Sequence, residues 1–373
     1  IEDRLYEGIH HLEYRGYDSA GVAVLQPGGK IDVVKAVGRV AVLESKLSDR
    51  APLAGTLGIA HTRWATHGGV TEPNAHPHRD DRHGIALIHN GIIENYSTLR
   101  TWLEEQGHHF QSETDTEVLT MLIGELYDGD LETAVQAALR EVTGAYAIAV
   151  ICEKEPGVLV AARKGSPLMV GIGAGEHIVA SDSSAVVAHT TQAVTLEDYQ
   201  VCRMTPTSFR TSTIDNVPVT PKVHELEMEL EEIERGGYPR CMLMEIFEQP
   251  NASRQTMRGR IDKREGRIVL GGVGPYARDL VKARRFILTA QGTALHAAKI
   301  GEYLFEDLAK IPAECEYASE FRYRNPIIEE GAVVIAVSQS GETADTLAAL
   351  REAKDRGALA LGVVNVVGRT IAR

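Results

Sequence analysis

The chain has 373 residues, of which 43% are apolar and 24% are charged, and its formal net charge is −13. This length and composition predict a globular protein with two domains and a sizeable core. The negative charge, without a basic stripe, argues against nucleic-acid binding, and no apolar run is long enough to predict a membrane span.

Residues 1–205 are predicted to form a mixed α+β domain that is rich in short strands. The chain opens in an amphipathic helix, and two further helices are expected between 115 and 140, with Thr116 and Asp130 as their caps. Apolar runs predict strands at 16–25, 55–63, 84–90, 145–152, 158–163 and 177–182. Strands and helices that alternate in such blocks predict a layered sandwich of sheets covered by helices.

The segment 206–240 is the expected linker, because it is punctuated by prolines and then becomes acidic. Residues 241–283 are expected to be a mainly helical lead-in to a second domain at 284–373. There, continuous apolar runs alternate with helical patterns, and this predicts a doubly wound parallel α/β sheet buried on both faces.

The four cysteines lie far apart in the sequence and form no CxxC pair or zinc-like spacing: Cys152, Cys202, Cys241 and Cys315. We therefore expect reduced, mostly buried thiols. No signal peptide is recognisable, which favours a cytoplasmic protein.

Three motifs outline a pocket for a small polar amide such as glutamine: HisThrArgTrpAlaThrHisGly at 61–68, HisAsnGlyIleIleGluAsn at 89–95 and SerGluThrAspThrGlu at 112–117. The guanidinium of Arg63 could bind the α-carboxylate, and the carboxylate of Asp115 could bind the α-ammonium. Asn90 and the backbone N–H of Gly91 could stabilise the oxyanion that forms when the amide is attacked. The sequence provides no obvious nucleophile for that attack.

A second motif, SerGlnSerGlyGluThr at 338–343, lies between a predicted strand and a predicted helix. Its hydroxyls, a glycine backbone and the helix N-terminus could hold a phosphate. It has no P-loop lysine, so we expect a phosphate monoester that is held and not transferred. A helix cap rich in Ser and Thr is the alternative. The loop GlnGlyThrAla at 291–294 is of the same kind but weaker.

Six histidines between 61 and 89 could suggest a metal site: His61, His67, His76, His78, His83 and His89. None of them shows the i, i+4 spacing of a zincin, so we expect no metal. His67 and His76 are expected to bond loop backbone or to line the pocket. The sequence GlyIleGlyAlaGly at 171–175 lacks a strand-to-helix context and is predicted to be a hairpin turn.

Together with LeuGluTyrArgGlyTyrAspSerAlaGly at 12–21 and GluGlnProAsn at 248–251, these motifs resemble the glutamine–fructose-6-phosphate aminotransferases (isomerizing). The resemblance implies an Ntn-hydrolase-like α/β/β/α sandwich, a class II glutamine amidotransferase domain, followed by the first, partial, sugar isomerase (SIS) domain. It implies synthesis of D-glucosamine 6-phosphate and glutamate from L-glutamine and D-fructose 6-phosphate, the first step towards UDP-N-acetylglucosamine. It also implies a homodimer that uses no cofactor.

The same resemblance implies roles for individual residues. Glutamine would be bound by Arg63, Trp64, Thr66, His67, Gly68 and Asp115. Asn90 and Gly91 would form the oxyanion hole, and Arg15 would lie beside the nucleophile. The sugar phosphate would be bound by Gly292, Thr293, Ser338, Gln339, Ser340 and Thr343.

Three departures from the family pattern affect these expectations. The opening CysGlyIleValGly, which carries the family's nucleophile, is missing, and so is the second SIS domain. We therefore expect the chain by itself to hydrolyse no glutamine. Gln291 stands where the family commonly has cysteine, and Ala294 where it often has serine.

Two other functions remain as alternatives. Another class II amidotransferase, such as the phosphoribosylamine-forming type, would require a phosphoribosyltransferase loop, and we find none. A sugar-phosphate regulator built on an SIS domain would not need an amide-binding half.

Overall fold

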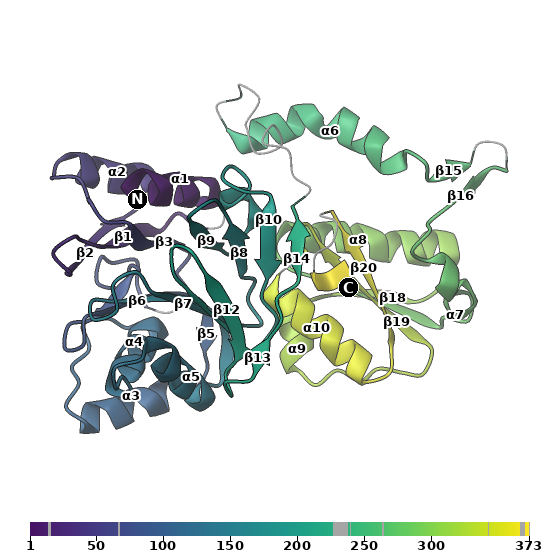
Figure 1. Cartoon of the computed structure of the whole chain (residues 1–373). Coiled ribbons are helices and arrows are strands. Elements are labelled where there is room, and N and C mark those ends of the chain that lie inside the picture. Colours follow the sequence, from purple (N-terminus) through teal and green to yellow (C-terminus); the bar gives the residue numbers. More distant parts are fainter. Residues whose placement is uncertain are drawn as a thin grey trace. The chain divides into compact units, whose positions relative to one another are not determined.

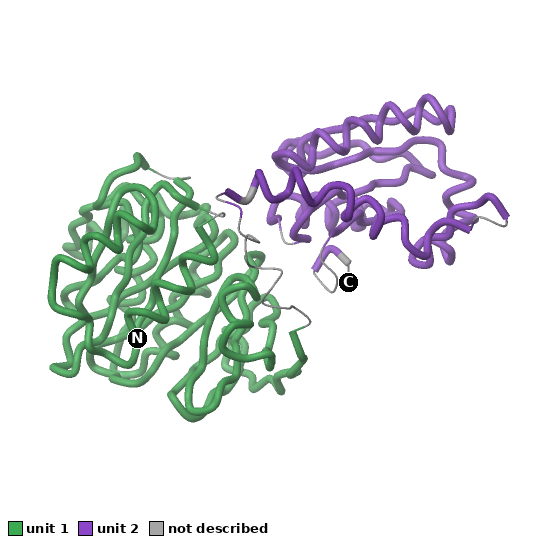
Figure 2. The backbone as a smooth tube through the Cα atoms, turned by 90° about the horizontal axis from the view of Figure 1, so that it is seen from above, with its two compact units in different colours: residues 1–237 green, residues 238–373 purple. Residues whose placement is uncertain are grey.

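The computed structural model describes residues 1–13, 16–65, 68–226, 238, 240–262, 265–341, 343–365 and 370–372. The chain divides into two compact units, Ile1–Gly237 and Tyr238–Arg373, which Figure 2 colours separately. Among the described residues, no helix is both long enough and apolar enough to cross a bilayer.

The first unit contains most of the strands. Its helices are α1 (Glu2–Leu12), α2 (Val40–Ser48), α3 (Tyr96–Glu105), α4 (Asp115–Glu125) and α5 (Leu131–Glu141), with the short η2 (Ser183–Ala185). Its strands are β1 (Ser19–Leu25), β2 (Ile31–Val37), β3 (Leu57–Arg63), β4 (His78–Asp80), β5 (Ile85–Ile93), β6 (Gly144–Cys152), β7 (Leu159–Lys164), β8 (Met169–Ile172), β9 (His177–Ala180), β10 (Gln192–Thr195), β11 (Gln200–Met204), β12 (Phe209–Thr213), β13 (Pro218–Val219) and β14 (Val223–Glu225).

These strands form three antiparallel sheets that are arranged in two layers. One layer holds the sheets β2-β1-β3 and β14-β10-β8-β9, and the other holds the sheet β13-β12-β11-β7-β6-β5-β4. Helices α1 and α2 cover the first layer, and α3, α4 and α5 cover the second (Figure 1). The unit is therefore an α/β/β/α sandwich, as predicted.

Strand β6 shows why the sequence folds into these layers. Its even-numbered residues, such as Ile148 and Val150, pack into the core beneath α3–α5. Its odd-numbered residues, Ala147, Ala149 and Ile151, pack between the sheets. Successive side chains of a strand point to opposite faces, so a strand buried on both sides reads as one continuous apolar run. Small alanines allow the two sheets to approach each other.

Two helix caps were predicted, and one position needs correction. Asp130 caps α5 as expected, because its side chain accepts a hydrogen bond from Thr133 N. In α4 the cap is Thr114, whose hydroxyl accepts from Glu117 N. Thr116 instead lies inside the helix, where its hydroxyl is 3.1 Å from His89 Nδ1. Either threonine satisfies the sequence rule for a cap, so only the backbone geometry separates them.

The predicted linker is corrected over much of its length. Residues 209–213 pair with β11, and residues 223–225 pair with β10, so both segments belong to sheets of the first unit. The strand character of 209–213 is hidden in the sequence because its buried residues, Thr211 and Ser212, are polar. Ser212 is satisfied by hydrogen bonds with Glu132 and Gln136 of α5. A strand of this kind lacks the apolar alternation on which prediction relies.

The second unit begins with a long helix and ends in a parallel sheet. Its elements are α6 (Cys241–Met257), β15 (Ile261–Asp262), β16 (Arg267–Ile268), η4 (Gly274–Tyr276), α7 (Ala277–Val281), β17 (Arg285–Ala290), α8 (Thr293–Leu304), the π-helical η5 (Phe305–Ala309), β18 (Ala313–Tyr317), α9 (Ala318–Tyr323), β19 (Ala332–Ser338), α10 (Ala344–Asp355), β20 (Leu359–Val364) and η6 (Thr370–Ala372).

The sheet order β18-β17-β19-β20 is parallel throughout, with helices on both faces. Phe286 and Leu288 of β17 pack towards α8, whereas Ile287 packs with residues of α9 and α10. This confirms the predicted doubly wound sheet. Because the chain runs from β17 to β18 on one side and then to β19 on the other, the strand order reverses between β17 and β19.

Candidate functional site

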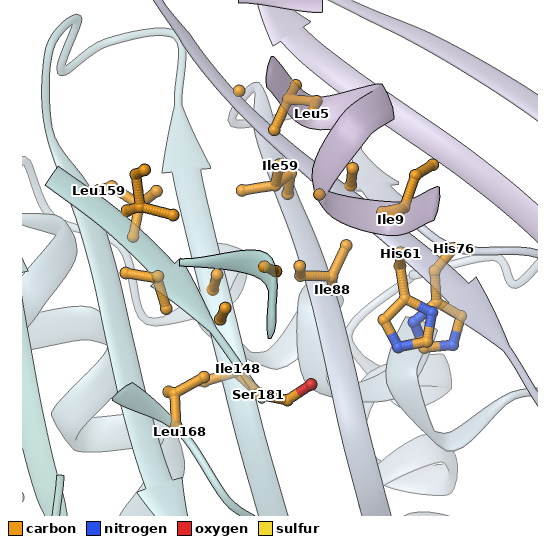
Figure 3. Close-up of a pocket in the computed structure, with 18 of the residues that line it drawn as sticks. Leu5, Ile9, Ile59, His61, His76, Ile88, Ile148, Leu159, Leu168 and Ser181 are labelled. Carbon is orange, nitrogen blue, oxygen red and sulfur yellow. The ribbon is translucent and has the colours of Figure 1, made fainter. Parts of the chain in front are cut away.

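A cavity of about 920 Å³ lies inside the first unit, between β3, β5, β6 and the β8–β9 hairpin, with α1 on its border. Apolar side chains form much of its wall, as Figure 3 shows for Ile59, Ile88, Ile148, Leu159 and Leu168. The residues of β3 and β9 that line it belong to strands at the edges of their sheets. The three predicted glutamine motifs also contribute to this cavity.

Arg63, the last residue of β3, lines the cavity and is only 5% exposed. Its Nη1 atom donates a 3.3 Å hydrogen bond to the carbonyl of Gly69. Burial lowers the pKa of the guanidinium, and the carboxylates of Asp18 and Asp115 act in the opposite direction. Arginine remains charged in proteins, so this is a buried cation suited to a carboxylate ligand.

Asp115 is the first residue of α4 and lines the same cavity. It is 4% exposed, and its Oδ2 atom accepts a 2.8 Å hydrogen bond from the backbone of Ile93. Its position at a helix N-terminus stabilises negative charge. The site therefore contains a buried anion as well as a buried cation, which matches the two charged ends of an amino acid.

Asn90 and Gly91 lie on β5 and also line the cavity. Gly91 has φ +151°, and a Cβ atom there would lie 2.1 Å from Ala145 O on the paired strand β6. No side chain fits in that space, so the position requires glycine. Asn90 is exposed and supplies a neutral amide donor next to the backbone N–H of Gly91. These are the donor types that an oxyanion hole uses.

Of the other residues predicted for the glutamine site, the structure describes some and not others. Trp64 lines the cavity and is 56% exposed, with its ring edge-to-face against Tyr17 at 5.3 Å. Gly68 has φ +74°, and a Cβ atom there would lie 2.7 Å from Asn74 Nδ2. Arg15, Thr66 and His67 lie outside the described residues.

Histidines form a stacked group beside the site. His61 and His76 both line the cavity and stack with their ring centroids 4.3 Å apart (Figure 3), and His78 packs edge-to-face on His76. Burial lowers the pKa of His61 to about 3 and holds the pKa values of His76 and His78 well below 6.5. The three rings are thus neutral at neutral pH. His76 Nδ1 accepts a hydrogen bond from the backbone N–H of His89, which lies in strand β5 and not in a loop, so of the two expected roles His76 shows the lining of the pocket.

The described cysteines are unsuited to nucleophilic attack. Cys152 and Cys202 are buried within strands, and burial raises the pKa of the Cys152 thiol and raises that of Cys202 to about 12. Cys315 is half-buried in the second unit, and its pKa is also raised by burial. A thiol must lose its proton to attack, so these three are structural. The side chain of Cys241 is outside the described residues.

In the second unit, the two predicted phosphate loops follow neighbouring parallel strands. The loop at 291–292 follows β17, and the loop at 338–343 follows β19. The carboxyl ends of adjacent strands share one edge of the sheet, and the strand order reverses here, which is where open α/β sheets bind ligands. The structure therefore brings the two loops to the same edge of the sheet.

Each loop leads into a helix. Gly292 has φ +57° and is the N-cap of α8, which begins at Thr293. Ser338 is buried, and its hydroxyl accepts a 3.0 Å hydrogen bond from Gly341 N and lies 3.4 Å from the hydroxyl of Thr343, the N-cap of α10. Gln339 is exposed and Ser340 is half-buried.

Gln291, one of the departures from the family pattern, connects the two loops. Its Nε2 atom donates a 3.1 Å hydrogen bond to the carboxylate of Asp345 in the first turn of α10. Asp345 also accepts a hydrogen bond from Arg322, at 3.4 Å. A longer polar side chain at 291 thus links the start of α8 to the start of α10.

Two polar residues beside the glutamine site, Asn74 and Glu113, were not predicted from the sequence; they are bonded to each other, and Asn74 also bonds the carbonyl of Gly69. Glu113 belongs to one of the quoted motifs, and Asn74 lies just after another. Their proximity to the motifs was the available signal, but the contact between them depends on the tertiary structure.

Comparison with known proteins gives two family matches and a group of similar proteins. Residues 48–238 match the glutamine amidotransferase domain model, and residues 279–373 match the SIS domain model. Glutamine–fructose-6-phosphate aminotransferase (isomerizing) of Chlorobaculum tepidum is 52% identical over 99% of this chain and 61% of its own length. The protein of the same name from Symbiobacterium thermophilum is 50% identical over 99% of this chain and 60% of its own length.

The chain thus spans about 60% of the length of these relatives. Among solved structures, glutamine phosphoribosylpyrophosphate amidotransferase from B. subtilis is similar, with a TM-score of 0.51 and 21% identity. The match covers 97% of this chain and 78% of the other. At this identity the similarity concerns the fold alone.

Proposed function

Because the chain belongs to the glutamine amidotransferase domain family, we propose that the whole protein makes D-glucosamine 6-phosphate and L-glutamate from L-glutamine and D-fructose 6-phosphate. One observation carries the glutamine half of this proposal. Arg63, Asp115 and the Asn90–Gly91 pair line one cavity, although they come from three separate segments of the chain. Together they match the α-carboxylate, the α-ammonium and the reacting amide of glutamine.

The residues of the first unit have distinct tasks in the proposed reaction. Arg63 and Asp115 bind the charged ends of glutamine, and this fixes the position of the side-chain amide. A cysteine thiolate attacks the amide carbonyl, and the Asn90 side chain and the Gly91 N–H donate to the oxygen as it becomes negative. Collapse of this intermediate releases ammonia and leaves a thioester, which water hydrolyses to glutamate. The structural thiols Cys152, Cys202 and Cys315 do not take this role.

In this proposal the second unit binds fructose 6-phosphate, which accepts the nitrogen. The loops that follow β17 and β19 offer Thr293, Ser338, Gln339, Ser340 and Thr343 to a phosphate monoester, with Gly292 at the start of α8. Hydroxyls and helix N-termini hold phosphate without transferring it. The ammonia adds to the sugar carbonyl, water leaves, and isomerisation gives the amino sugar.

Two features favour this reaction over the phosphoribosylamine-forming alternative. The relatives at about 50% identity are named glutamine–fructose-6-phosphate aminotransferase. Glutamine phosphoribosylpyrophosphate amidotransferase, by contrast, is only 21% identical to this chain. The SIS match over 279–373 also fits a sugar phosphate. The glutamine pocket in turn favours an enzyme over an SIS-type regulator.

We also propose a cytoplasmic homodimer that binds neither nucleic acid nor a membrane. The net charge of −13 disfavours a polyanionic partner. On α6, the apolar side chains Met242, Ile246 and Phe247 are exposed, which supports burial against a second subunit.

The test uses the whole protein with glutamine labelled with ¹⁵N in its side-chain amide, and with fructose 6-phosphate. Mass spectrometry should find the label in glucosamine 6-phosphate and none of it in glutamate. Replacing fructose 6-phosphate with phosphoribosyl pyrophosphate should give no labelled amine. Labelled phosphoribosylamine, or unlabelled products, would contradict the proposal.

A further inference from the structure

Asn74 links two loops that flank the cavity of the first unit. Its side chain is 2% exposed and makes three hydrogen bonds. Nδ2 donates to Gly69 O at 2.9 Å and to Glu113 Oε2 at 3.1 Å, and Oδ1 accepts from Glu113 N at 3.0 Å. A buried amide that is satisfied in this way fixes the groups around it, because breaking any bond leaves a polar atom unpaired.

Glu113 completes the link from the other loop. Its Oε2 atom also accepts a hydrogen bond from Gly69 N, at 3.1 Å. Both backbone polar groups of Gly69 are thus held, the carbonyl by Asn74 and the amide by Glu113. The hydrogen bond from Asn74, and then the one from Gly69, lower the pKa of Glu113, so its carboxylate stays ionised at neutral pH.

This network reaches the two charged groups of the proposed glutamine site. On one side, the carbonyl of Gly69 accepts the hydrogen bond from Arg63 Nη1. On the other side, Glu113 precedes Asp115 by two residues, and Asp115 is itself fixed by the amide of Ile93. Arg63, at the end of β3, and Asp115, at the start of α4, therefore adjoin the two loops that Asn74 ties together.

The space around the network is also restricted. A Cβ atom at Gly68 would lie 2.7 Å from Asn74 Nδ2 and 2.9 Å from Glu113 Cβ. The chain thus passes closely over both side chains. Glu113 itself is exposed, so its side chain adds little to the hydrophobic core. Its bonds instead connect one loop to the other.

We propose that Asn74 and Glu113 are positioning residues that set the separation between the two charged ends of the glutamine site. This inference rests on the proposed function. Neither residue touches the reacting amide. Both act through the Arg63–Gly69 contact and through the backbone that leads to Asp115. Loosening the network weakens the binding of the amino-acid ends, and chemistry at the amide continues once glutamine is bound.

The experiment measures glutamine hydrolysis by the whole protein and by its variants. Because Glu113 is exposed, Glu113→Ala should fold normally. It should raise the KM for glutamine about five- to tenfold, as expected for losing one or two hydrogen bonds, and should change kcat less than twofold. The inhibition constant of L-glutamate should rise by the same factor, because glutamate presents the same charged ends. The KM for fructose 6-phosphate should not change.

Further variants separate positioning from general damage. Glu113→Gln keeps an oxygen acceptor for Gly69 N and should recover most of the lost affinity. Asn74→Asp keeps the acceptor for Glu113 N but places a second carboxylate beside Glu113, so it should also raise KM. The effects of Asn74→Asp and Glu113→Ala should combine less than additively, because the two residues act in one network. The matched control is Glu72→Ala, which removes a nearby exposed carboxylate that pairs with Lys46.

The possible outcomes are distinct. If the unmodified protein releases no glutamate from glutamine, the proposed function fails, and the positioning role fails with it. If the unmodified protein is active but Glu113→Ala leaves the glutamine KM and the glutamate inhibition constant unchanged, the positioning role alone is wrong. A fall in kcat at constant KM would overturn it as well, since that result would place Glu113 in the chemical step.

Discussion

The backbone amide of Ile93 donates a 2.8 Å hydrogen bond to the carboxylate of Asp115. This bond joins the end of strand β5, three residues after Asn90, to the start of helix α4. The group proposed to bind the glutamine ammonium is thus anchored to the strand proposed to stabilise the oxyanion. A carboxylate held by a backbone amide and a helix N-terminus loses little freedom when a ligand arrives.

Asp115→Asn tests the charge of this anchor. Asparagine can keep an oxygen acceptor for Ile93 N but loses the ion pair with the substrate ammonium. We expect the KM for glutamine to rise about 10- to 100-fold, which corresponds to the loss of one charged hydrogen bond. Steady-state kinetics of glutamate release by the whole protein measure this effect. Asp215→Asn is the control, because that carboxylate is exposed and distant in sequence. An unchanged KM would remove Asp115 from the site.

Gly91→Ala tests the close approach of β5 and β6. The added methyl group would meet Ala145 O at 2.1 Å, so the two strands must separate. We expect a loss of stability on the order of 2 kcal/mol and the loss of glutamine hydrolysis. Gly107→Ala separates crowding from backbone strain, since Gly107 has φ +84° but no atom of the described residues lies within 4 Å of its Cβ position. Measured by urea unfolding, Gly107→Ala should lower the free energy of unfolding clearly less than Gly91→Ala. An equal loss of stability in both variants would contradict the importance of the contact between Gly91 and β6.

The histidine group predicts a dependence of stability on pH. The pKa values of His61, His76 and His78 are lower in the folded protein than the unfolded value of 6.5. Below pH 6.5 the unfolded chain therefore binds more protons than the folded one. The stability from these groups is complete above pH 6.5 and is lost as the pH falls towards 3.

Urea unfolding at pH 7.5 and pH 5.5 measures this loss. Both tryptophans, Trp64 and Trp102, lie in the first unit, so their fluorescence follows that unit alone. We expect the free energy of unfolding to fall by roughly 1 kcal/mol or more. Most carboxylates titrate below this range. His61→Phe should reduce the pH dependence, whereas replacement of the exposed His109 should not. Equal stability at both pH values would contradict the prediction.

Thr343→Val tests the sugar-phosphate loop. Valine has nearly the shape of threonine, so the variant removes the hydroxyl at the start of α10 without opening a large cavity. We expect the affinity for fructose 6-phosphate to fall about five- to tenfold, measured by calorimetry on the whole protein. The glutamine KM should not change. Thr256→Val on α6 is the matched control, since its hydroxyl donates to Ala252 O of its own helix. Unaltered affinity in Thr343→Val would favour the simple helix cap.

Much of the fold was predictable because its signals are local. The parallel sheet of the second unit appears in the sequence as continuous apolar strands, and Phe286, Ile287 and Leu288 alternate between two helix-covered faces as such strands must. The hairpin turn at 171–175 was also predictable, and the pairing of β8 with β9 confirms it. By contrast, β12 and β14 were taken for a linker, because the buried residues of β12 are polar and the short strand β14 has no buried residue.

For the glutamine site, the sequence by itself determined the types of group present. Arg63, Asn90 and Asp115 each stand in a motif whose chemistry suits one part of glutamine, and no fold is needed to see that. Only the tertiary structure decided how these groups are held. The hydrogen bonds between Asn74 and Glu113, and the one between Ile93 and Asp115, join residues 22 or more positions apart. Side-chain chemistry is a property of each residue, whereas such contacts exist only once the strands and loops have packed.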